Sequence, residues 1–201
     1  MYALVESGNI TKYFNSPKGF TLGDYQYSAD VFTKWSDSER AAIGIYSIIF
    51  DDSNKKDEQW YINTNQSYTF ANNKVTASYG SATAKAHADT TWTAQDETDG
   101  KGTEGEVKEE GLKTKLIRIV KAQAANELAK TDWYITRKSE KNTAIPSAIT
   151  THRDAVRSKQ AAMETAITNA SDTPALETLY TYTRQEDGSV TRPLGELPTL
   201  E

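Results

Sequence analysis

Residues 112–133 read LKTKLIRIVKAQAANELAKTDW, and this stretch decides the fold of the C-terminal half of the chain. Its apolar residues recur every four positions, which is the spacing of one face of an α-helix. The stretch therefore predicts a helix of about four turns with one buried face. The residues of that face are Leu112, Leu116, Val120, Ala124 and Leu128, with Ile117 beside them.

Two further helices are expected downstream. Asp132 can cap a short helix over residues 133–141, and Pro146 is suited to begin a third helix that runs to about residue 170. The heptad spacing of the third helix is too short and imperfect for a long coiled coil, so we expect a helical hairpin that packs on itself over residues 112–183. Its expected inner face consists of Ile149, Val156, Met163, Ile167 and Ala170.

The C-terminal residues carry turn signals. Thr173 followed by Pro174 can begin another short helix that reaches Tyr180. The dipeptide Asp187-Gly188 favours a hairpin turn between extended residues on either side. We therefore expect residues 184–201 to form a turn and an extended tail.

Aromatic residues are concentrated in the first segment, since 15 of the 20 Phe, Trp and Tyr residues lie in residues 1–79. Short apolar runs alternate there with turn residues, which favours strands. We predict a β-rich domain over residues 1–80, an antiparallel meander of four to six strands. One short helix is expected after Ser36, because Ser36 and Glu39 have capping-box spacing and Gly44 can end a helix.

Residues 81–111 differ in kind from both neighbours. They hold 3 Lys and Arg against 8 Asp and Glu, a net charge of −5 that equals that of the whole chain. Trp92 is their only large apolar side chain, so the segment alone lacks the surface to offset the entropy of ordering. We expect an acidic, glycine-containing linker that is held by a partner or packs on its own domain. The chain as a whole is predicted to be α+β.

Composition excludes several classes of function. The chain has no cysteine, and no window approaches 18 consecutive apolar residues, so thiolate chemistry and membrane insertion are not expected. The N-terminal residues lack the pattern of a signal peptide. No basic cluster is large enough to neutralise many phosphates, so nucleic acid is not an expected partner.

No catalytic, cofactor-binding or metal-binding constellation is predicted. The two histidines, His87 and His152, stand apart, and His152 is expected to be a solvated or hydrogen-bonded helical residue. The glycines at 100, 102 and 105 follow an acidic stretch that cannot be a buried strand, so they indicate a loop and no dinucleotide site. Adjacent carboxylates such as Asp51-Asp52 do not face each other and indicate solvated turns. We expect no enzyme activity.

Residues 112–157 combine an amphipathic helix, the block Thr131-Asp132-Trp133, a helix begun by Pro146, and the run Arg153-Asp154-Ala155-Val156-Arg157. This order resembles the C-terminal helical segment of bacteriophage tail-fibre assembly and tail-associated proteins, except that His152 stands where those have tyrosine. The resemblance implies a non-enzymatic tail component, made in the host cytoplasm and located in the virion tail. Its implied partners are fibre, baseplate or tail-tube proteins, and it is multimeric in the assembled tail.

Partner-binding residues are expected in both halves of the chain. Asp132 should cap its helix, and Trp133 is expected in the core of the hairpin, with a partner anchor as the alternative. Arg137, Arg153 and Arg157 would pair with carboxylates or cover the Trp133 ring. Two other functions stay open: an assembly chaperone absent from the mature virion, and a module that binds a host-surface glycan. The glycan-binding function requires exposed aromatic residues aligned on one face, drawn from Trp35, Trp60, Tyr61 and Tyr68.

Overall fold

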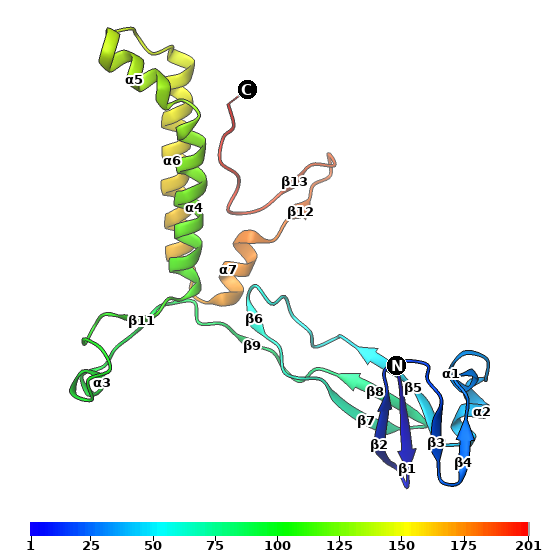
Figure 1. The fold of residues 1–201 in the computed structure, drawn as a ribbon. Coiled ribbons are helices and arrows are strands. Elements are labelled where there is room, and N and C mark those ends of the chain that lie inside the picture. Colours follow the sequence, from blue (N-terminus) through cyan, green and yellow to red (C-terminus); the bar gives the residue numbers. More distant parts are fainter. Residues whose placement is uncertain (201) are drawn as a thin grey trace. The chain divides into compact units, whose positions relative to one another are not determined.

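The computed structural model describes residues 1–200, which form two compact units (Figure 1). The first unit is Met1–Thr83 and the second begins at Ala84. Strands dominate the first unit and helices the second, which confirms the α+β class. The elements of the first unit are β1 (Tyr2–Glu6), β2 (Asn9–Phe14), β3 (Phe20–Leu22), β4 (Tyr25–Tyr27), α1 (Asp30–Thr33), α2 (Asp37–Ala42), β5 (Ile45–Asp51), β6 (Tyr61–Ile62), β7 (Ser67–Ala71) and β8 (Lys74–Ser78).

The first unit is built on a five-stranded sheet with the order β2-β1-β5-β8-β7. The β1–β2 hairpin turns at Ser7 and Gly8, both with positive φ. The prediction of a purely antiparallel meander is wrong, because β5 and β8 run parallel, with Ile48 opposite Val75. The physical reason is the connection between them. This connection contains β7, and the Asn72-Asn73 turn after β7 reverses the chain. β8 therefore runs antiparallel to β7 and in the same direction as β5.

The sheet curls until its two edge strands approach each other. Tyr13 on β2 and Tyr68 on β7 bring their ring centroids to 4.9 Å, which protects edges that would otherwise pair with other chains. Tyr46 and Phe70 also pack together, with centroids 4.7 Å apart. The rings of Tyr46, Tyr68 and Phe70 pack against a small apolar core that consists of Ala3, Val5, Ile48, Val75 and Ala77.

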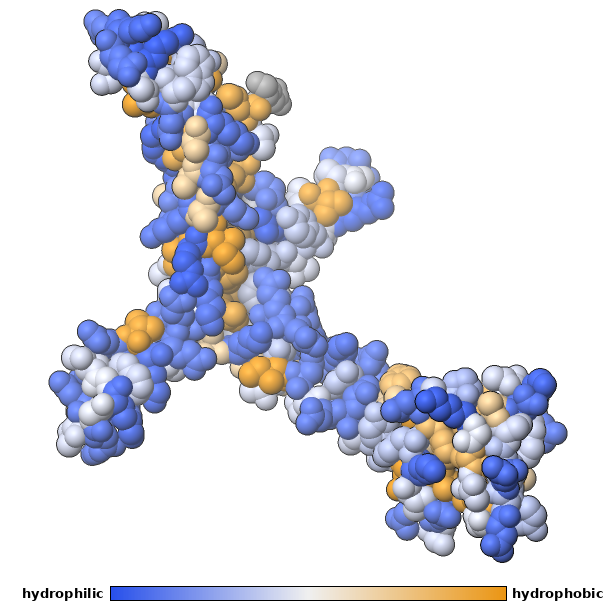
Figure 2. Space-filling view, viewed as in Figure 1, coloured by the Kyte–Doolittle hydropathy of each residue, from blue (hydrophilic) through white to orange (hydrophobic). Residues whose placement is uncertain are grey.

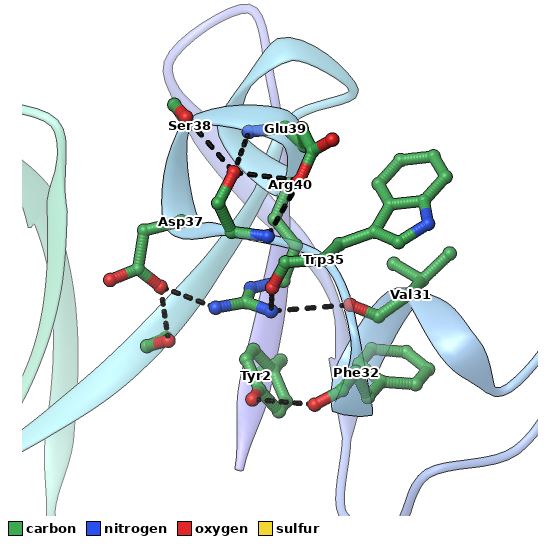
Figure 3. A network of polar contacts seen from close by, with 10 residues as sticks. Tyr2, Val31, Phe32, Trp35, Asp37, Ser38, Glu39 and Arg40 are labelled. Atoms are coloured by element: carbon green, nitrogen blue, oxygen red, sulfur yellow. Dashed lines mark hydrogen bonds and ion pairs between the residues drawn. The ribbon is translucent and has the colours of Figure 1, made fainter.

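A second core lies on the other face of the sheet, under α1 and α2. It contains Leu4, Phe14, Val31, Phe32 and Ile45. Figure 3 shows how Arg40 of α2 ties this layer together: its guanidinium donates to the carbonyls of Val31 and Trp35 and pairs with Asp37. The predicted capping box is confirmed, since Glu39 N–H donates to Ser36 Oγ and Ser36 N–H donates to Glu39 Oε2.

The second unit is organised by an antiparallel helix pair, α4 and α6. Their contacts run in opposite directions along the chain, with Lys113 near Thr168 and Glu127 near His152. Most of the predicted stripe is buried: Leu112, Leu116, Val120 and Ala124 are buried, while Ile117 and Leu128 are half-buried. All the predicted inner-face residues of the third helix are buried. The elements of this unit are β10 (Thr90–Thr91), α3 (Ala94–Thr98), β11 (Val107–Glu109), α4 (Leu112–Ala129), α5 (Asp132–Lys141), α6 (Ser147–Asn169), α7 (Thr173–Tyr180), β12 (Thr183–Arg184) and β13 (Val190–Thr191), with β9 (Thr83–Ala84) at the boundary of the units.

The acidic segment has its own secondary structure, which differs from the linker predicted for residues 81–111. β10 pairs with β11, and Thr93 and Asp96 form a capping box that starts α3. A single ring serves as the core: Trp92 lies against Gly102, and the Lys108 ammonium lies 4.7 Å from its centroid. The surface is mostly hydrophilic around α3 (Figure 2). Local capping and one aromatic ring therefore order a segment whose composition favours disorder.

This segment is continuous with the helix pair. The N–H of Leu112 donates to the Ala86 carbonyl at 3.0 Å, and Asp89 accepts from Gly111 N–H at 2.6 Å and from the Thr114 hydroxyl at 2.8 Å. These bonds hold the pKa of the Asp89 carboxyl below its ordinary value, chiefly through the Gly111 N–H. The boundary between the two units therefore lies between residues 83 and 84. The sequence predicted domain boundaries near residues 80 and 111 instead.

The C-terminal elements follow the predicted order. α7 begins at Thr173, whose hydroxyl donates to the Lys85 carbonyl at 2.6 Å, and Leu176 and Leu194 are buried. The β12–β13 hairpin turns at Gly188, which has a φ of 85°. Beyond it the chain turns again, with Gly195 N–H donating to the Arg192 carbonyl at 2.9 Å, and residues 196–200 have no regular secondary structure.

Candidate interaction surface on α5

A buried arginine fixes the junction between α4 and α5. Arg153 of α6 donates to the Leu128 carbonyl at 2.8 Å and to the Thr131 hydroxyl at 2.6 Å. It also pairs with Asp132 Oδ1 at 2.8 Å. The predicted capping by Asp132 is wrong: Thr131 is the N-cap residue, and no side chain caps this helix. Asp132 lies one residue later, in the first turn of α5, and its carboxylate pairs with Arg153 of α6.

The helix that follows buries none of its residues. Trp133 is 52% exposed and Ile135 is 43% exposed, so the prediction of a core position for Trp133 is wrong. The reason is geometric. α5 turns away at the end of the helix pair (Figure 1), where no described element covers its outer face. The alternative expectation, an anchor for a partner, is the one that this exposure leaves open.

The exposed Trp133 ring packs against half-buried Tyr134 and against an arginine. The Trp133 and Tyr134 ring centroids are 3.7 Å apart, and the Arg137 guanidinium lies 4.8 Å from the Trp133 centroid. Arg137 therefore covers the Trp133 ring, as expected for one of the three arginines. Arg157 instead pairs with Asp154 on α6 at 3.3 Å, away from this cluster. Rigid aromatic side chains with an arginine are the residue types that are enriched at protein interfaces.

The charge of α5 is mainly positive. Arg137, Lys138 and Lys141 form no ion pair with any residue in the described part of the chain, while the one carboxylate beside them is Glu140. Lys138 and Lys141 lie in the last turn, where positive charge also favours the helix dipole. We call the set Trp133, Tyr134, Ile135, Arg137, Lys138 and Lys141 the α5 surface.

The aromatic candidates of the first unit do not form an exposed face. Trp60 and Tyr61 are buried, Tyr68 packs on Tyr13, and half-buried Trp35 lies with its edge against Tyr27 at 6.0 Å. The prediction that Trp35, Trp60 and Tyr61 bind a partner is therefore wrong for the two buried residues. Both rings are buried within the chain and so are not available to a partner.

Sequence reasoning missed one buried polar cluster. Glu127 of α4 lies against His152 of α6, with 3.3 Å between Oε1 and Nε2, and accepts from Leu200 N–H at 3.3 Å. A hydrogen bond from Lys130, with smaller effects of Leu200 and His152, holds the pKa of Glu127 below its ordinary value despite burial. Only the i,i+3 pair Glu127–Lys130 was visible in the sequence. The other partners are distant along the chain.

Residues 1–200 contain no group of three His, Asp or Glu side chains placed to hold a metal ion. None of the described helices combines the length and the apolar character that crossing a bilayer requires. No protein-family model matches the chain, and no curated protein or solved structure shows significant similarity to it.

Proposed function

We propose that this chain is a non-enzymatic component of a bacteriophage tail, located in the virion, that attaches to a fibre, baseplate or tail-tube protein through the α5 surface. Two features support the proposal. Residues 112–157 resemble tail-fibre assembly and tail-associated proteins, and the same residues carry the α5 surface. The chain would be made in the host cytoplasm and act as a multimer in the tail.

The observation that carries this proposal is the exposure of Trp133 on a helix that buries none of its residues. A large aromatic ring in water forgoes the stabilisation that burial would give it. The ring is nevertheless held by Tyr134 and Arg137, so its shape is preorganised for a partner. Such central, ordered aromatic residues contribute most of the binding energy at many interfaces.

Purified particles of the phage that encodes the chain test this proposal. Mass spectrometry should detect the chain in the particles, and cross-linking should join lysines near α5 to one neighbouring tail protein. Trp133→Ala should prevent incorporation, while Ile49→Ala, which removes a comparably exposed apolar side chain in the first unit, should not. Incorporation of the Trp133→Ala chain at the wild-type level would contradict the proposal.

An assembly chaperone remains the second candidate, since the same surface would serve it. The two differ in one result. A chaperone binds fibre subunits during assembly and is absent from purified particles, whereas a structural component is present in them.

A further inference from the structure

We infer that the α5 surface of one chain docks on the acidic edge of a second copy, so that copies associate head to tail. The acidic edge consists of Glu104, Glu106, Val107 and Glu109, on and just before β11. This inference rests on the proposed function, for which it names one partner. It follows from the charge, the exposure and the spacing of the two surfaces.

The acidic edge offers unpaired carboxylates around an exposed apolar side chain. Val107 is 51% exposed. The side chains of Glu104, Glu106 and Glu109 form no ion pair or hydrogen bond with any residue in the described range 1–200. The neighbouring carboxylates already have partners within the chain: Asp96 caps α3, Asp99 pairs with Lys101, and Glu110 pairs with Arg118.

The α5 surface has the complementary character. Its apolar part is Trp133 and Ile135, and its charged part is Arg137, Lys138 and Lys141. Asp132, which would oppose an acidic partner, is already neutralised by Arg153 at 2.8 Å. Each surface thus combines one exposed apolar patch with unpaired charges, and the signs are opposite.

The two surfaces are kept apart within a single chain. The acidic edge is joined to the first turn of α4 through the bonds from Leu112 N–H and Gly111 N–H, and α5 follows the last turn. α4 has 18 residues and packs along α6, so it acts as a rigid spacer about 27 Å long. The complementary surfaces can therefore meet only between chains.

A contact between two different surfaces has a specific consequence. Each copy that docks presents a fresh acidic edge at one end and a fresh α5 surface at the other, so association continues until it closes into a ring or forms a filament. Charge contributes much of the attraction, and we therefore expect weak association that salt reverses, because the Debye length falls to about 3 Å at 1 M salt.

Sedimentation of the full-length chain tests the inference with two charge-reversal variants. Lys138→Glu with Lys141→Glu disables the α5 surface, and Glu106→Lys with Glu109→Lys disables the acidic edge. Each variant alone should be monomeric, because its two surfaces carry charge of the same sign. An equimolar mixture should associate, because the unchanged surfaces of the two variants attract each other and the two reversed surfaces are complementary again. Lys18→Glu with Lys74→Glu makes the same change in net charge as the α5 variant, at exposed sites of the first unit, and should associate like the wild type.

Each alternative result decides the matter. A wild type that stays monomeric at low salt, a variant that still dimerises alone, or a mixture that forms no complex would overturn the head-to-tail contact. The proposed function is judged separately by particle incorporation of Trp133→Ala. If that variant is excluded from particles while the wild type is monomeric at low salt, the α5 surface binds a different tail protein.

Discussion

Arg153 and Asp132 form an ion pair of 2.8 Å in which the arginine is buried and the aspartate is largely exposed. The asymmetry indicates what the arginine contributes. Its other bonds, to the Leu128 carbonyl and the Thr131 hydroxyl, lock the last turn of α4 to α6 and so set the direction in which α5 leaves. Arg153 is thus a residue that positions the α5 surface without belonging to it.

Replacing Arg153 by methionine should lower the free energy of unfolding of the second unit by about 1–3 kcal/mol, because two buried acceptors lose their donor. Asp132→Asn should cost less than about 1 kcal/mol, since an exposed partner in an ion pair contributes little. Urea unfolding followed by far-UV circular dichroism measures both, because the long helices lie in this unit. Equal losses for the two variants would show that the ion pair, and not the carbonyl and hydroxyl bonds, is what matters.

Trp133→Ala should change the free energy of unfolding by no more than about 1 kcal/mol, the value of an exposed cation–π contact. The core residue Leu116 provides the contrast: Leu116→Ala should cost about 2–5 kcal/mol. Both are measured by urea unfolding of the full chain. A loss for Trp133→Ala as large as that for Leu116→Ala would restore the core position that the sequence suggested.

Periodic features of the sequence predicted the structure well, and contacts across long separations were not visible in it. The four-residue stripe from Leu112 and the Ser36–Glu39 capping box are local patterns, and both are found as predicted. The parallel pairing of β5 with β8 depends on how a long connection is routed. The exposure of Trp133 depends on the absence of a covering element. Neither property is encoded in the spacing of neighbouring residues.

In the segment around Trp92, local contacts determine the structure although the composition favours disorder. Thr93 and Asp96 have capping-box geometry, and Gly102 lies so close to the Trp92 ring that an added Cβ would come within 2.5 Å of it. Sequence reasoning assigned the glycines to a loop but could not pair one of them with the tryptophan. That pairing turns an acidic stretch into a folded one.

Gly102→Ala should therefore disrupt the fold of this segment, at a cost of about 1–3 kcal/mol for overpacking. The readout is hydrogen exchange at the amides of Trp92 and Gly105, which bond to the Glu106 and Trp92 carbonyls at 2.9 and 3.0 Å. Both amides should be protected in the isolated wild-type chain and exchange faster in the variant. Gly100→Ala is an imperfect control because φ is 70° there, so Thr103→Ala, at an exposed neighbouring site, serves instead. Fast exchange of both amides in the wild type would contradict a segment ordered by its own contacts.

Acid should release the C-terminal tail through Glu127. Because the pKa of this carboxyl is held below its ordinary value of 4.5, chiefly by Lys130, the unfolded chain binds more protons than the folded chain in that pH range. The stabilisation is therefore fully present above the ordinary pKa and is lost as the pH falls through the lower, folded value. On protonation the Leu200 N–H loses a charged acceptor, and Lys130 loses its counter-ion. Hydrogen exchange of Leu200 should accelerate across this pH range in the wild type. In Glu127→Gln it should be fast at every pH once the intrinsic rate is corrected for, and a wild-type profile that matches the variant would rule out Glu127 as the residue that holds the tail.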